Sequence, residues 1–102
     1  FPARAGHHLA PATLSDGRNV YERLDGRFTL LALDAPDGDV SAFVEAAAAL
    51  GVPLQVIRDD RGGERARWDA ELALVRPDQF VAWTGRSGSA DPGAVLRRSV
   101  GS

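Results

Sequence analysis

The residues best suited to chemistry are two adjacent histidines, His7 and His8, the only histidines in this 102-residue sequence. Histidine serves as a general acid or base near neutral pH, or as a metal ligand. Neighbouring residues in an extended segment point to opposite sides, so the two rings cannot readily bind one metal ion. No serine or carboxylate stands at a spacing that identifies a catalytic partner. We therefore predict a structural hydrogen bond for His7 rather than catalysis.

Thiol chemistry is impossible because the sequence contains no cysteine. Disulfide bonds, thiolate catalysis, iron–sulfur clusters and cysteine zinc sites are excluded together. A cysteine-free chain also fits a reducing compartment, and we expect a cytoplasmic location.

A dinucleotide-binding turn of the Gly-x-Gly-x-x-Gly type does not occur. The nearest imitation is Gly-Arg-Ser-Gly-Ser at residues 85–89, in which Arg86 could hold an anion. Asp91 follows at the expected start of a helix and would place a carboxylate where a phosphate should lie. We therefore expect a solvent-exposed loop there, and no catalytic, cofactor-binding or metal site in this chain.

The charge distribution argues against two classes of partner. The net charge is −2, and no run of basic residues forms a patch for nucleic acid. No stretch approaches the roughly 20 apolar residues that span a membrane. The charged residues 59–67 predict a solvated loop. Trp68 follows this loop and is a candidate for contacts with other domains or a second subunit, as is His7.

Apolar patterns define the elements that position these residues. Residues 28–33 predict a buried strand, and an amphipathic helix follows to residue 50, with Asp37 or Asp39 as its cap and Gly51 at its end. Residues 53–57 predict a second strand, which a right-handed crossover makes parallel to the first. A last helix begins at Pro92, with Asp91 as its cap.

Residues 72–76 and 80–83 predict an antiparallel hairpin around a turn at Pro77 and Asp78. Strict alternation places Val81 and Trp83 on one face of the second strand, with Trp83 as a core anchor.

The resulting element order is β-α-β-β-β-α, preceded by a short helical turn at residues 21–24. It predicts an α/β, thioredoxin-like fold: a four-stranded mixed sheet with helices packed on it. Residues 1–25 form an extended N-terminal arm and residues 26–102 the thioredoxin-like domain, within one compact unit. A start at Phe1 and Pro2, without methionine, suggests a fragment of a longer chain.

Two segments carry a resemblance to a known family. Residues 74–83 (LVRPDQFVAW), with Arg76, Pro77, Asp78 and Trp83, resemble a hairpin in the thioredoxin-like C-terminal domain of flavoprotein aromatic hydroxylases, the group of phenol and polyketide hydroxylases. Upstream, Arg4, His7, Leu14, Asp16, Gly17, Tyr21 and residues 28–31 resemble the segment that leads into that domain. The sequence departs from the family pattern at Gly6 (usually Pro), Gln79 (usually Gly) and Thr84 (often basic).

This resemblance implies a parent enzyme that uses FAD and NAD(P)H to hydroxylate a phenol-like or polyketide ring. The chain itself would be an inactive structural or assembly domain, packed on the flavin-binding and substrate domains of the parent, with a homodimer as a further possible contact. One alternative is an independently encoded binding or dimerisation module without redox activity. The least favoured is a free-standing enzyme that uses His7.

Overall fold

A mixed sheet of four strands forms the centre of the computed structural model, which describes residues 7–60, 62–63, 70–86 and 91–101. The strand order is β2-β1-β3-β4. β1 runs parallel to β2 and antiparallel to β3, and β3 runs antiparallel to β4. The elements are α1 (Val20–Arg23), β1 (Phe28–Leu33), α2 (Asp37–Leu50), β2 (Leu54–Asp59), β3 (Leu72–Val75), β4 (Val81–Gly85) and α3 (Pro92–Gly101). The predicted α/β fold, with helices packed on a four-stranded mixed sheet, is confirmed.

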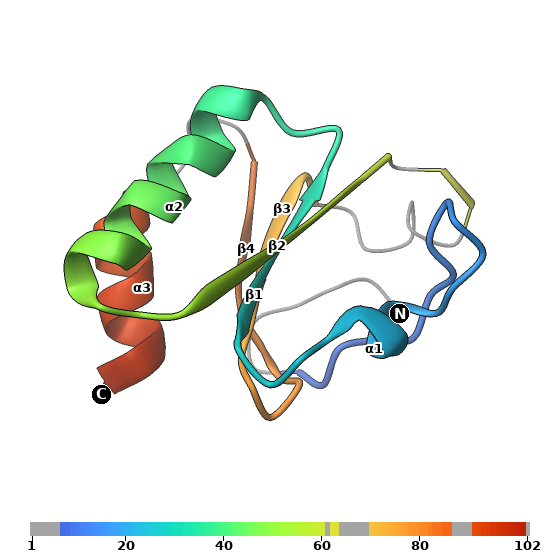
Figure 1. The fold of residues 1–102 in the computed structure, drawn as a ribbon, viewed down its shortest axis with the longest axis horizontal. Coiled ribbons are helices and arrows are strands. Elements are labelled where there is room, and N and C mark those ends of the chain that lie inside the picture. Colours follow the sequence, from blue (N-terminus) through green and yellow to red (C-terminus); the bar gives the residue numbers. More distant parts are fainter. Residues whose placement is uncertain (1–6, 61, 64–69, 87–90, 102) are drawn as a thin grey trace.

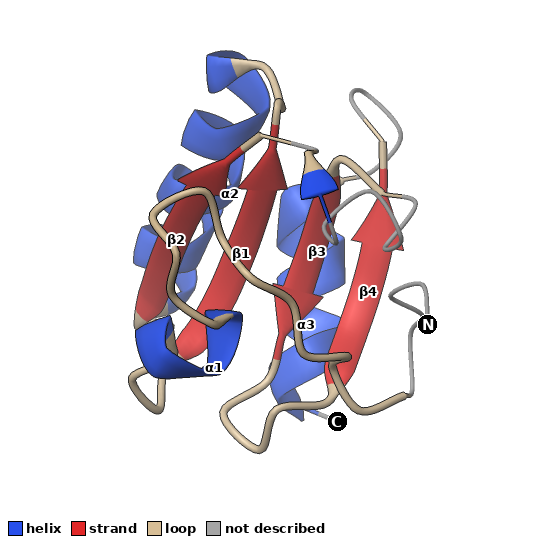
Figure 2. Cartoon of the chain, turned by 90° about the vertical axis from the view of Figure 1, so that its right-hand side faces the viewer, coloured by secondary structure: helices blue, strands red, loops and turns tan. Residues whose placement is uncertain are grey.

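Each face of the sheet has its own cover (Figures 1 and 2). Helices α2 and α3 lie on one face, and α1 with the N-terminal arm lies on the other. Alternation along β1 sends Leu30 and Ala32 to the helices, and Leu31 and Leu33 to the arm. Because both faces of β1 are buried, its sequence is apolar at every position except Thr29.

The hairpin contains a β-bulge that the strict alternation did not predict. Leu74 pairs with Trp83 and Val75 pairs with Val81, which leaves Ala82 as an extra residue in β4. The prediction that Val81 and Trp83 share one face is therefore wrong. Val81 packs on the arm side, whereas Trp83 packs on the helix side, its ring centroid 5.4 Å from that of Phe43.

The start of α2 also differs from the prediction. Pro36 occupies the N-cap position, and no side chain caps the helix. Asp37 is the first helical residue and pairs instead with Arg58, at 2.8 Å. Asp39 sits where a carboxylate could accept from the N-cap backbone N–H, but proline has none, and its Oδ2 is buried without a partner.

The other predicted helix ends are confirmed. Gly51 ends α2 in the left-handed conformation with φ of 71°, which glycine adopts at little cost. Asp91 caps α3, because its Oδ1 accepts from the backbone N–H of Gly93 at 3.0 Å.

Candidate functional site

The arm joins the hairpin next to β4 through backbone hydrogen bonds. The N–H of Leu9 donates to the carbonyl of Gln79 at 2.9 Å, and the N–H of Val81 donates to the carbonyl of His7 at 2.7 Å. His8 and Phe80 form an antiparallel bridge between these bonds. The arm thus adds a short extended segment to the edge of the sheet, beside the hairpin that carries the family motif.

The hairpin turn is held by its own polar residues. The N–H of Gln79 donates to the carbonyl of Arg76, and the N–H of Arg76 donates to the carbonyl of Phe80, both at 2.8 Å. The side chains of Arg76 and Asp78 form an ion pair at 2.7 Å, with each side chain about half exposed. Gln79 adopts a positive φ of 72°, the left-handed position that commonly closes a three-residue hairpin loop. Arg76, Pro77 and Asp78 therefore shape the turn.

A cluster of aromatic side chains connects the arm to this hairpin. The ring of His8 stacks on Tyr21, with centroids 5.9 Å apart, and meets Phe80 edge-on at 5.2 Å. The Tyr21 hydroxyl donates to the carbonyl of Leu9 and lies 2.9 Å from His8 Nδ1. Because the single hydroxyl proton goes to Leu9, Nδ1 of His8 must be the donor in the second bond. Burial raises the pKa of Tyr21 above its ordinary value.

The structure distinguishes the two histidines in a way that sequence reasoning missed. His7 contributes its backbone carbonyl to the bridge, and its side chain is exposed. His8 makes the side-chain contacts. The aromatic residues Tyr21 and Phe80 are the sequence signal for this role of His8. They approach His8 only because segments distant in the sequence pack together.

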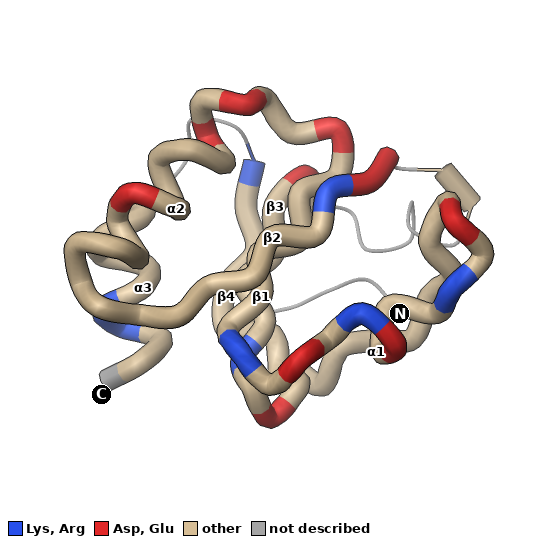
Figure 3. Tube along the Cα trace, in the orientation of Figure 1, with Lys and Arg blue, Asp and Glu red and all other residues tan. Residues whose placement is uncertain are grey.

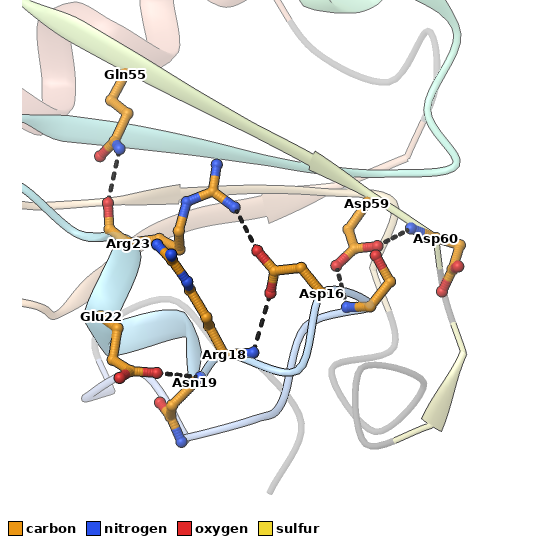
Figure 4. A network of polar contacts seen from close by, with 9 residues as sticks. Asp16, Arg18, Asn19, Glu22, Arg23, Gln55, Asp59 and Asp60 are labelled. Atoms are coloured by element: carbon orange, nitrogen blue, oxygen red, sulfur yellow. Dashed lines mark hydrogen bonds and ion pairs between the residues drawn. The ribbon is translucent and has the colours of Figure 1, made fainter.

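A second polar network connects the arm to β2, the strand at the edge of the sheet opposite β4 (Figure 4). The N–H of Ser15 donates to Oδ2 of Asp59 at 2.9 Å, and Nε2 of Gln55 donates to the carbonyl of Arg23 at 2.6 Å. Asp16 and Arg23 form an ion pair at 3.2 Å. The arm is therefore anchored at both edges of the sheet.

Helix α1 has the complete cap that α2 lacks. The side chain of Asn19 accepts from the N–H of Tyr21 at 3.1 Å, and Glu22 accepts from the N–H of Asn19 at 2.8 Å. This capping box satisfies the donors at the start of the helix. It fixes Tyr21 where its hydroxyl reaches Leu9.

Within the part of the chain that the structure describes, no group of three or more histidine, aspartate and glutamate residues could hold a metal ion. The residue after β1, Asp34, and two residues in the first turn of α2, Asp37 and Asp39, carry carboxylates that would repel the phosphates of a flavin. Arg4 and Trp68 lie outside the described residues. No described helix is both long and apolar enough to cross a membrane.

Comparison with protein families decides what this arrangement belongs to. The family model described as "Aromatic-ring hydroxylase, C-terminal" matches residues 3–102. The chain belongs to this family. An FAD-dependent monooxygenase, opdD, of Penicillium oxalicum is 32% identical over 86% of the chain and 18% of its own length. A 4-methyl-5-nitrocatechol 5-monooxygenase of a Burkholderia species is 32% identical over 93% of the chain and 19% of its own length.

Solved structures agree with this assignment. RebC, a rebeccamycin biosynthetic enzyme solved with reduced flavin, has a TM-score of 0.84 and 30% identity, covering 99% of this chain and 20% of its own. An aklavinone-11 hydroxylase solved with FAD and aklavinone has a TM-score of 0.69 and 27% identity, covering 94% of this chain and 20% of its own. The hydroxylase C-terminal domain described here thus spans about one fifth of the length of these relatives.

Proposed function

We propose that this chain is a non-catalytic structural and assembly domain at the C-terminus of an FAD- and NAD(P)H-dependent aromatic-ring hydroxylase. The carrying observation is the family match over residues 3–102, to a domain that forms about one fifth of flavin monooxygenases. In this proposal FAD and NAD(P)H bind to the remaining four fifths, and the complete enzyme is cytoplasmic. The three carboxylates between the end of β1 and the first turn of α2 support the placement of the flavin outside this chain.

The surface that meets the catalytic part is the arm–hairpin surface, which we define as His7, His8, Arg76, Pro77, Asp78 and Phe80. All six residues are exposed, and Phe80 has 40% of its surface accessible. Aromatic and arginine side chains are enriched in protein interfaces, where they act as anchors. Trp68 is proposed as a further contact on sequence grounds.

The first test asks whether the chain carries chemistry by itself. The purified chain is mixed with FAD, desalted and examined for flavin absorbance, and then assayed for oxidation of NADH or NADPH with a phenol. We expect no retained flavin and no oxidation. Stoichiometric flavin, or substrate-dependent oxidation, would refute the proposal. The coding frame upstream of Phe1 gives a second test: a nearby start codon, without a Gly-x-Gly-x-x-Gly segment, would favour an independent module.

The second test addresses assembly. The chain and the remaining part of the hydroxylase are produced as separate polypeptides, and their association is measured by calorimetry. Phe80→Ala is expected to weaken binding by about tenfold or more. Val44→Ala is the matched control, because Val44 is similarly exposed (44%) but lies on α2, on the opposite face of the sheet. Equal effects of the two variants would remove the arm–hairpin surface from the interface.

The same measurements separate a homodimer from contact within one chain. If the isolated chain forms a dimer that Phe80→Ala dissociates in sedimentation experiments, the arm–hairpin surface joins two subunits instead. His7→Ala in the full-length hydroxylase is expected to retain full turnover. A large loss of turnover with assembly intact would support a catalytic role for His7.

A further inference from the structure

A groove of about 240 Å³ runs between the hairpin and α3 and adjoins the arm–hairpin surface at Arg76. β4 contributes Val81, Ala82 and Trp83 to its wall, and α3 contributes Val95, Arg98 and Ser99. Arg76 closes the end nearest the turn. Among the described residues, the lining of the groove therefore combines apolar side chains with two cationic ones and includes no carboxylate.

One side of the groove is the outer edge of β4, the last of the described strands in the sheet. β4 is the last strand in the order, so its outer edge carries backbone groups that no neighbouring strand of the sheet pairs. In the described part of the chain, residues 7–9 use this edge only at Gln79 and Val81. From Ala82 onward, no described strand lies beside β4 (Figure 2). An extended peptide fits such an edge, because its backbone can pair with the exposed groups.

The charges of the groove indicate which peptide it would take. Figure 3 shows basic residues, in blue, on α3 near its C-terminal end. Arg98 lies in the last turn of α3 and makes no ion pair with any residue that the structure describes. Arg76 bonds Asp78 through one Nη atom only, which leaves its other N–H groups available. The hydroxyl of Ser99 donates to the carbonyl of Val95 at 2.7 Å and keeps its lone pairs. Guanidinium groups bind carboxylates through short, charge-assisted hydrogen bonds.

We propose that this groove binds an extended acidic segment of the hydroxylase outside this chain, which adds as a strand to β4. In an extended strand alternate side chains point to opposite faces of the sheet, and the groove lies on the face that α3 covers. Every second side chain of the segment would therefore face α3, and acidic residues at these positions would reach Arg98 and Arg76. This inference rests on the proposed function, because it takes the segment from the catalytic part. It concerns a different surface, which shares only Arg76 with the arm–hairpin surface.

The test uses the 102-residue chain and a synthetic peptide, acetyl-Glu-Val-Glu-Val-Glu-amide, followed by NMR. The expected result is a saturable shift of the Ala82–Gly85 backbone amides and the Trp83 indole N–H at millimolar peptide, weakened by salt. The same peptide with glutamine in place of glutamate is expected to bind at least tenfold more weakly. Absence of saturable shifts with the acidic peptide would overturn the proposal.

Arg98→Glu supplies the decisive variant, and Arg97→Glu supplies its control. Both residues are exposed in the last turns of α3, and both substitutions change the net charge by the same amount, but only Arg98 lines the groove. We expect Arg98→Glu to weaken peptide binding about tenfold more than Arg97→Glu does, as for loss of one charge-assisted bond. Equal effects would reduce the binding to nonspecific attraction and overturn the proposal.

Two other occupants give distinct results in the same spectra. Nuclear Overhauser contacts from residues 1–6 to Ala82–Gly85 in the free chain would show that the chain fills its own groove. Shifts of these amides on dilution, with a change in sedimentation, would show that a second copy fills it. Either result overturns the proposal. None of these outcomes bears on flavin binding or on the effect of Phe80→Ala, which test the proposed function separately.

Discussion

Helices α2 and α3 cover one face of the sheet with regular structure, whereas the arm covers the other face with a single helical turn, α1. The helix side buries Val40, Phe43, Ala47, Val95 and Leu96. The arm side buries Leu9, Ala12, Leu14 and Val20, a similar number of apolar side chains from a segment without a continuous helix or strand. Regular secondary structure is therefore not required to close a core.

The two covers satisfy their backbone groups by different means. Helices α2 and α3 satisfy most of theirs internally. The arm relies on individual bonds to other elements, such as those from Leu9 to Gln79 and from Ser15 to Asp59. The ordered conformation of the arm thus depends on both apolar burial and polar contacts.

The largest effect is expected from removal of the arm. A chain that begins at Asp25 would expose Leu31, Leu33, Ile57 and Val75, which are almost completely buried in the complete chain. Burial of such side chains contributes about 1.5–3 kcal/mol each, so the four together contribute about as much as the whole stability of a typical small domain, roughly 5–15 kcal/mol. We expect this chain to be unfolded or aggregated, as measured by near-ultraviolet circular dichroism and NMR dispersion. A folded monomer would show that residues 26–102 form an independent domain.

A pair of leucine substitutions compares the faces directly. Leu9 in the arm and Leu96 in α3 are 1% and 0% exposed. If both covers are equally part of the core, Leu9→Ala and Leu96→Ala should each lower the free energy of unfolding by about 2–5 kcal/mol. Urea denaturation measures both values. A cost below about 1 kcal/mol for Leu9→Ala alone would indicate that the arm moves to fill the space.

The helix side could be predicted from sequence better than the arm side. Periodic apolar residues indicated α2, and Asp91 with Pro92 indicated the start of α3, because both signals are local. The arm has no such period, and its order depends on partners distant in sequence, such as Asp59 for Ser15. The sequence therefore predicts only an extended segment there, with a short helical turn at residues 21–24.

Local signals also failed where one residue changed the expected geometry. The bulge at Ala82 moved Trp83 to the helix side, although strict alternation predicts otherwise. Pro36 displaced the expected aspartate cap of α2 and left an oxygen of Asp39 without a donor. In the candidate site, the motif identified Arg76 and Asp78, but the role of His8 required knowledge of the fold.

A smaller effect on stability is expected from Tyr21→Phe, which removes the hydroxyl group that bonds Leu9 and His8 but keeps the aromatic ring. The carbonyl of Leu9 and Nδ1 of His8 each lose a partner, so we expect a loss of about 1–2 kcal/mol near neutral pH. A loss below about 0.3 kcal/mol would show that the ring alone holds the arm.

The pH dependence of this variant has a defined sign. Burial raises the pKa of Tyr21 in the folded state. The resulting stability is present below the unfolded pKa of about 10 and is lost as pH rises through the higher folded value. Stability should therefore fall more steeply above about pH 10 in the original chain than in Tyr21→Phe. Because Tyr21 is the only tyrosine, an absorbance titration reports its pKa alone; a value at or below 10 would contradict the burial effect.

The smallest effect is expected from substitution of Gln79, whose backbone carbonyl accepts a hydrogen bond from the N–H of Leu9 in the arm. A residue with a side chain is strained at φ of 72°, whereas glycine is not, although glycine loses more entropy on folding. Gln79→Gly should therefore raise the free energy of unfolding by about 0.5–1 kcal/mol, and Gln79→Ala, which keeps Cβ, should not. Hydrogen exchange at the Leu9 amide then reports the arm. If this amide becomes better protected in Gln79→Gly, turn strain weakens the junction; if global stability rises without added protection at Leu9, the arm opens independently of the turn.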